Sequence, residues 1–216
     1  MQEEVSPSTY YGLNDMVKIS CQDCKGCFDC CQGMGNSIIL NPYDIYLLTS
    51  NLHESFEELL EGKVELGVED GMIIPHLVMD KSRDCCSFLN KEGRCSIHEF
   101  RPNLCRLFPL GREYSGDKIR YFLLENVCNR RDKVKIKVGK WLGYKNIHEI
   151  EEFLLCWHTL IKEFEEETPH LSQEEIKKKN MYLLNLFFLT PYIEGTNFTM
   201  QFYERLDKYK AYQTFY

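Results

Sequence analysis

The spacing of the cysteines constrains this chain more than any other feature of its sequence. Five of the eleven fall close together, at Cys21, Cys24, Cys27, Cys30 and Cys31. Two cysteines separated by two residues can hold one metal ion, because the turn between them aims both sulfurs at a common point. Reduced thiols that serve only as small apolar side chains are not expected at this density. The first cluster therefore predicts a metal site.

A second group of cysteines follows, at Cys85, Cys86, Cys95 and Cys105, with Cys128 beyond it and Cys156 alone. Four thiolates suit zinc or an iron–sulfur cluster equally well, because both are thiolate-binding metals. The first cluster also fits the cysteine run of bacterial ferredoxins, although Gln32 stands where a proline would follow and no second run exists. No C-x3-C-x2-C run is present, which argues against a radical S-adenosylmethionine enzyme. The choice of metal stays open.

Charge and hydrophobicity restrict the compartment and the partners. The net charge of −7 argues against nucleic-acid binding, which needs a concentrated positive surface. Basic residues at 130–140 alternate with apolar ones and predict a half-solvated strand. We expect no membrane partner, because the longest apolar stretch is too short to span a bilayer. The acidic, polar N-terminus lacks the pattern of a secretory signal, so we expect a cytoplasmic protein with reduced thiols.

The predicted architecture is α+β, with a cysteine-rich, loop-dominated metal-binding domain followed by a mainly helical tail. We divide the chain into an N-terminal extension (1–20), the metal-binding domain (21–131) and the helical C-terminal region (132–216). In the front part, metal–thiolate bonds are expected to take the place of a large apolar interior. The tail offers a surface for a protein partner.

Local signals predict individual elements in both parts. Asn41 and Pro42 mark a helix start, as cap and first helical residue, and a short helix is expected at 53–60. Glu69-Asp70-Gly71 and Ser115-Gly116-Asp117 indicate the turns of two β-hairpins, at 64–80 and 108–124. Three helices are expected in the tail, at 147–167, 172–189 and 198–212. The second of them begins with the capping box of Ser172 and Glu175.

The cysteine pattern resembles the signature of the CxxCxxCC family (YkgJ-like), described as zinc- or iron-chelating. The resemblance covers roughly residues 21–130 and rests on several pieces in order: Cys24-x2-Cys27-x2-Cys30-Cys31, residues 38–45, Cys86-x-Phe-Leu, Gly93-Arg-Cys95-x-Ile and Arg101-Pro-x-x-Cys105-Arg-x-Phe-Pro. The chain departs from the pattern at Ser87, where the family usually has proline, and at His98, where it often has an aromatic residue. Cys21 and Cys85 are additional to it.

What the resemblance implies is metal chelation by a set of eight cysteines: Cys24, Cys27, Cys30, Cys31, Cys86, Cys95, Cys105 and Cys128. Cys21 and Cys85 are further candidates outside the family pattern. Zinc, iron or an iron–sulfur cluster would fit these sulfurs. Four nearby arginines could offset the negative charge of the thiolates or serve as ordinary surface residues: Arg83, Arg94, Arg101 and Arg106. For His98, a polar residue at a helix start is favoured over a ligand.

Three functions are compatible with this pattern. The first is a metal-binding protein whose site has a structural, sensing or metal-handling role. The second is a metal-dependent enzyme that modifies protein, because flagellin lysine N-methylases look like distant relatives with a similar cysteine block. The third is an iron–sulfur electron carrier. The sequence contains no phosphate-binding loop and no hydrolase or metalloprotease motif, so whether the protein is an enzyme stays open.

Overall fold

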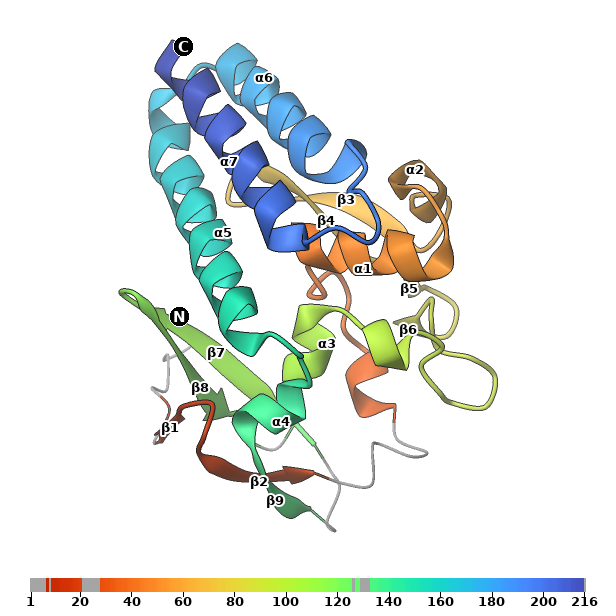
Figure 1. The fold of residues 1–216 in the computed structure, drawn as a ribbon. Coiled ribbons are helices and arrows are strands. Elements are labelled where there is room, and N and C mark those ends of the chain that lie inside the picture. The colour runs from red at the N-terminus through yellow and green to blue at the C-terminus, as the bar shows by residue number, and fades with distance from the viewer. Residues whose placement is uncertain (1–6, 8, 21–27, 126, 129–132, 216) are drawn as a thin grey trace.

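The computed structural model describes residues 7, 9–20, 28–125, 127–128 and 133–215, which form short helices, three longer helices and small antiparallel sheets (Figure 1). The α-helices are α1 (Pro42–Leu52), α2 (Phe56–Leu59), α3 (Asn103–Leu107), α4 (Val138–Leu142), α5 (Ile147–Glu167), α6 (Gln173–Leu184) and α7 (Phe198–Phe215). Single 3-10 turns cover Asp29–Cys31, His98–Phe100 and Thr168–His170. The mixture of helices and strands confirms the predicted α+β class.

Three strand pairs are local in sequence, and two are formed over long range. They are β1 (Tyr10–Tyr11), β2 (Met16–Ser20), β3 (Val64–Glu69), β4 (Met72–Leu77), β5 (Met79–Asp80), β6 (Cys85–Cys86), β7 (Leu110–Ser115), β8 (Lys118–Leu123) and β9 (Val134–Lys137). In the described part of the chain, the sheets have the orders β1-β8-β7, β2-β9, β3-β4 and β5-β6, all antiparallel. β1 and β2 thus pair with strands more than a hundred residues away in sequence.

Several local predictions are confirmed. Asn41 caps α1, accepting the N–H of Asp44 at 2.9 Å while the Asp44 carboxylate accepts the N–H of Asn41 at 3.0 Å. Ser172 and Glu175 form the predicted capping box of α6. Both hairpins form, and Asp70 and Gly71 adopt positive φ angles at the turn of the first. α5 has the predicted bounds.

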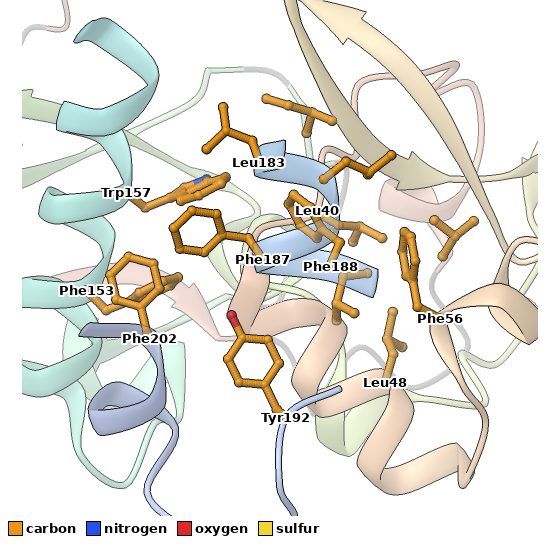
Figure 2. Packing of buried hydrophobic residues seen from close by; sticks show 14 of the residues in the cluster. Leu40, Leu48, Phe56, Phe153, Trp157, Leu183, Phe187, Phe188, Tyr192 and Phe202 are labelled. Carbon is orange, nitrogen blue, oxygen red and sulfur yellow. The ribbon is translucent and has the colours of Figure 1, made fainter. Parts of the chain in front are cut away.

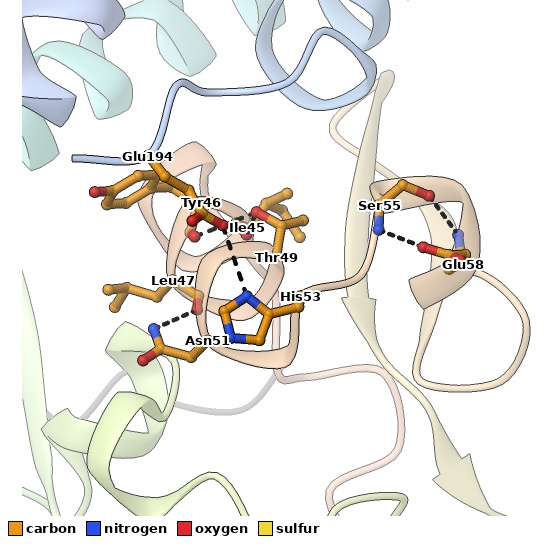
Figure 3. Close-up of polar contacts among 9 residues, drawn as sticks. All are labelled: Ile45, Tyr46, Leu47, Thr49, Asn51, His53, Ser55, Glu58 and Glu194. Atoms are coloured by element: carbon orange, nitrogen blue, oxygen red, sulfur yellow. Dashed lines mark hydrogen bonds and ion pairs between the residues drawn. The ribbon is translucent and has the colours of Figure 1, made fainter. Parts of the chain in front are cut away.

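Two helices differ clearly from the prediction, and α7 starts as expected but extends beyond the predicted end at 212 to Phe215. The expected helix at 53–60 is shorter, because His53 ends α1 in the left-handed conformation and Ser55 starts α2 with a capping box to Glu58 (Figure 3). The expected helix at 172–189 is α-helical only to Leu184. A π-helical turn, Asn185–Leu189, follows and places Phe187 and Phe188 in the interior.

The apolar interior corrects one expectation. Leu40, Leu48 and Phe56 from the front half belong to one hydrophobic cluster with residues of α5, the π-helical turn and α7. In Figure 2 the rings of Trp157 and Phe187 lie beside Leu40 and Leu183, and the two rings meet edge to face with centroids 5.3 Å apart. The expectation that metal–sulfur bonds replace an apolar interior in the front half is therefore wrong for residues 38–97, which share the core of the tail.

A second, smaller cluster lies where the N-terminal strands meet the middle of the chain. Val17 and Ile19 of β2 are buried with Tyr121 of β8, Val138 and Leu142. This packing, like the pairing of β2 with β9, joins residues on both sides of the expected boundaries at 20 and 131, and the division into domains stays a prediction. In the part of the chain that the structure describes, each helix is too short or too polar to cross a membrane.

The shared core predicts how the protein responds to loss of one ring. Replacing Phe187 by alanine removes a fully buried side chain that contacts Trp157 and Phe202. We expect the free energy of unfolding to fall by about 3–5 kcal/mol. Denaturant unfolding followed by circular dichroism measures it. The matched control is Met200→Ala, at a side chain 61% exposed, which should change stability by less than about 0.5 kcal/mol. Similar values for both variants would contradict this core.

Candidate metal centre

Five cysteines from four separate segments line one small cavity of about 60 Å³: Cys30, Cys31, Cys86, Cys95 and Cys105. Its apolar part comes from Ile38, Leu77 and Met79, and its polar part from Arg94, His98 and Arg101. Cavities of this size admit an ion or a few water molecules. The fold therefore gathers five of the eight cysteines that the family resemblance implied, from positions up to 75 residues apart in sequence.

The first two sulfurs are carried by the 3-10 turn Asp29–Cys31. The turn is closed by the N–H of Cys31, which donates to the carbonyl of Phe28 at 2.8 Å. The Sγ atoms of Cys30 and Cys31 lie 4.0 Å apart. The residue after them, Gln32, forms an antiparallel β-bridge with Cys85, so this turn lies next to β6.

Cys86 and Cys95 are held by a common local arrangement. Burial raises the pKa of each thiol. A backbone N–H two residues further on opposes this shift by donating to the sulfur: Phe88 donates to Cys86 and Ile97 donates to Cys95. Such donors stabilise a thiolate and fix its orientation, as the outer-shell partners of metal ligands do. The pairing of Leu89 with Cys95 brings the two segments together. Both sulfurs are therefore oriented before any ion binds.

Cys105 is placed by the attachment of α3 to α1. The buried carboxylate of Asp44 accepts the N–H of Asn103, the first residue of α3, at 2.7 Å. The Asn103 side chain accepts from Arg112 at 2.6 Å and donates to the hydroxyl of Tyr144 at 2.8 Å. One polar network therefore fixes the start of the helix that carries Cys105.

Burial strongly disfavours thiolates in this cavity. The hydrogen bond with Cys30, together with burial, holds the pKa of the Cys31 thiol well above its usual range. Burial raises the pKa of Cys86 to about 11 and raises that of Cys105 well above its usual range, and the neighbouring cysteines add to both shifts. Several thiols in one low-dielectric site cannot all ionise without a positive charge among them. Sulfur is a donor that soft divalent cations prefer, and such an ion would supply that charge.

The four arginines named from the sequence have different positions. Arg94 and Arg101 line the cavity, and Arg101 lowers the pKa of Cys95, opposing the effect of burial. Arg83 forms an exposed ion pair with Asp80 at 2.8 Å. Arg106 does not line the cavity but donates to the carbonyls of Glu99 and Arg101. Two of the four are therefore placed to offset thiolate charge.

His98 lies at the cavity as well as at the start of a 3-10 turn, so both readings of this residue agree with its position. Trp141, from α4, lines the cavity and was missed in the sequence. It donates its indole N–H at 3.2 Å to the carbonyl of Phe108, a residue of the family pattern that also lines the cavity. No local signal in the sequence links Trp141 to the cysteines, because they meet only through the fold.

The remaining candidate sulfurs do not line the cavity or lie outside the described residues. Cys85 is buried beside Cys86 on β6 but does not line the cavity, since successive residues of a strand face opposite sides. Cys128 lies outside the lining, as does Cys156 on α5. Cys21, Cys24 and Cys27 are outside the described residues. Among the residues that the structure describes, no three His, Cys, Asp or Glu side chains are arranged so that they could hold an ion. Ligation by the candidate cysteines stays a prediction.

Comparison with known protein families matches residues 23–129 to a family model described as "CxxCxxCC: Putative zinc- or iron-chelating domain". The matched segment contains all five cysteines of the cavity. It supports metal binding in general, with zinc or iron as the metal. Comparison with curated proteins and with solved structures gave no match.

The Asp44 carboxylate, which positions α3, predicts a pH dependence of stability. Burial raises the pKa of Asp44 to about 6, although hydrogen bonds from Asn41 and Asn103 oppose the shift. An unfolded aspartate titrates near ~3.9, so the folded protein binds this proton more tightly and loses stability as the pH rises from about 4 to about 6. Relative to Asp44→Asn, we expect the metal-free wild type to lose on the order of 1–3 kcal/mol between pH 4 and pH 7. Urea unfolding of both proteins at several pH values measures the difference, and a constant difference would contradict the raised pKa.

Proposed function

Residues 23–129 of this chain belong to the CxxCxxCC zinc- or iron-chelating family, and from this premise we propose that the cysteine-lined cavity binds zinc or iron through thiolates. The observation that carries the proposal is the convergence of Cys30, Cys31, Cys86, Cys95 and Cys105 on one cavity. Scattered structural thiols have no reason to meet in this way, whereas metal ligands must. The conversion of buried thiols to thiolates is then driven by the charge of the ion.

The proposed ligands are these five cysteines together with Cys24, Cys27 and Cys128, which the family pattern adds. Eight sulfurs exceed the four that one tetrahedral ion needs, so they suit two ions or one polynuclear centre. Arg94 and Arg101 reduce the net negative charge that such a centre carries. We do not count His98 among the proposed ligands, because the cysteine sulfurs already suffice.

The role that we propose is metal handling or sensing rather than maintenance of the fold. In a zinc finger the metal replaces the missing core, so the apo protein is unfolded. Here Leu40, Leu48 and Phe56 are already buried against the helices of the tail. Cys30, Cys31, Cys95 and Cys105 are only partly buried, which leaves a route for an ion to enter and leave. We place the protein in the cytoplasm, where its thiols stay reduced, and assign to the helical tail the contact with a protein partner.

The electron-carrier alternative rests on the ferredoxin-like spacing of the first cluster. It requires an iron–sulfur centre, which absorbs visible light and bleaches on reduction, whereas a zinc centre is colourless. Anaerobic purification with metal analysis and a visible spectrum separates the two. The enzyme alternative, a protein-modifying activity distantly like that of flagellin lysine N-methylases, requires a cosubstrate site near the cysteines.

Removal of one cavity sulfur tests the ligand assignment. We expect Cys105→Ser to lower the metal content of the purified protein at least severalfold, because a hydroxyl is a much poorer ligand than a thiolate for these metals. Metal analysis by mass spectrometry, normalised to protein, measures the content. The matched control is Cys156→Ser, on α5 and outside the cavity, which should retain the wild-type content. Equal metal content in the two variants would remove Cys105 from the ligands.

Removal of the metal tests the proposed role. Because the apolar core is shared with the tail, we expect treatment with a strong chelator to leave the helical circular dichroism signal nearly unchanged. The apo protein should still unfold in a cooperative transition, at a lower temperature than the metal-loaded form. Collapse of the helical signal on chelation would show that the metal maintains the fold, as it does in a zinc finger.

A further inference from the structure

A second hollow, of about 470 Å³, lies between α1, the segment that leads into α3, the link from α4 to α5 and the start of α7 (Figure 1). We call it the aromatic groove, after Tyr43, Tyr46, Phe100, Tyr144 and Phe198, which line it. The segment 98–106 contributes to both hollows. His98, Arg101, Pro102 and Cys105 face the cysteine cavity, whereas Glu99, Phe100 and Arg106 face the groove.

Arg106 is a buried cation with an unused donor at this groove. Only 8% of the residue is exposed, its Nε donates to the carbonyl of Arg101 at 3.0 Å and its Nη2 to that of Glu99 at 2.6 Å. Among the described residues, Nη1 has no hydrogen-bond acceptor. It lies on the groove side, because a Cβ atom on the groove-lining Gly143 would be 3.7 Å from it. A guanidinium so placed can still bind one acceptor from the groove.

The network around Arg106 holds the guanidinium in place. It lies over the ring of Tyr144, with 4.9 Å between its carbon and the ring centroid. The hydroxyl of Tyr144 is fixed by the side chain of Asn103. Since both the cation and the ring beneath it are fixed before a ligand arrives, binding an anion requires little loss of conformational entropy.

The floor of the groove supplies an apolar surface of aromatic rings. The ring of Phe198 lies 4.9 Å from that of Tyr43 and 5.4 Å from that of Tyr46, centroid to centroid. Exposed charges of both signs line the groove as well: Lys145, Glu99 and Glu149. The two carboxylates disfavour a ligand with several negative charges, whereas a single anionic group can reach Arg106.

We propose that the aromatic groove binds a small molecule with one carboxylate or phosphate group on an apolar or aromatic body. The anionic group binds Arg106 through Nη1, and the body packs on Tyr43 and Tyr46. An apolar surface beside one fixed charged group is a combination that small-molecule sites commonly use. The site is separate from the proposed metal function, because no cysteine lines the groove.

Calorimetric titration of the full chain with simple probes tests the ligand class. Benzoate and phenyl phosphate carry a ring with an anionic group, benzyl alcohol and benzylamine lack the anion, and acetate and inorganic phosphate lack the ring. We expect benzoate or phenyl phosphate to bind saturably, and at least about tenfold more tightly than the probes that lack one part. The tighter of the two identifies the anionic group. Failure of both to bind at millimolar concentration would overturn the proposal.

Two variants locate the bound probe. Arg106→Lys shortens the donor and removes its planar geometry, so affinity for the better probe should fall at least about tenfold. Asn51→Trp fills the groove from the exposed side of α1, where Asn51 lies beside Leu47 (Figure 3), and should abolish binding. Its control is Gln173→Trp, an equally exposed amide on α6 outside the groove, which should bind as the wild type does.

Each outcome decides for or against the groove. Should Arg106→Lys fail to fold, Asn51→Trp still reports on the site, since it changes only an exposed helix position. Binding that persists unchanged in Asn51→Trp would overturn the proposal. Titration of chelator-treated protein gives the last control: binding that is lost with the metal would assign the probe to the cysteine cavity and not to the groove.

Discussion

The packing of the tail helices against the front half is the constraint on which the rest of the structure depends. Phe187 and Phe188, from the π-helical turn, lie in one apolar cluster with Leu40, Leu48 and Phe56. That cluster fixes α1. The carboxylate of Asp44, in the first turn of α1, in turn fixes α3 and with it Cys105. A side chain of the candidate metal centre is thus positioned by aromatic packing through a buried polar network.

Elements that are determined by adjacent residues could be predicted from the sequence. The caps at Asn41 and Ser172 and the turn at Asp70 and Gly71 act within a few residues, and each is present in the structure. The pairing of β2 with β9 could not be predicted, because no local signal links strands so far apart. The core of the front half was missed for a related reason. Its apolar residues lie in short elements such as α1 and β4, and they become a core only when the tail helices cover them.

The candidate site shows the same limit at the scale of single side chains. The structure brings Cys86, Cys95 and Cys105, which the family pattern names together with the first cluster, to one cavity with Cys30 and Cys31, and ligation by these cysteines stays a prediction. The density of cysteines did not show that Cys86 lines the cavity and Cys85 does not. The alternation of side chains along a strand explains this difference. The contributions of Trp141 and Asp44 depend on contacts between distant segments. Spacing in the sequence indicates the ligand type, but only the fold shows which neighbours control its charge.

The segment 98–106 lies between the cysteine cavity and the aromatic groove, and its residues line both. Cys105 and Arg106 are adjacent residues of α3, and their side chains contribute to different hollows, the cysteine cavity and the aromatic groove. Arg106 is also bonded to the carbonyls of Glu99 and Arg101, and Arg101 itself lines the cavity. The two hollows are therefore adjacent in the fold, and one turn of helix forms the wall between them.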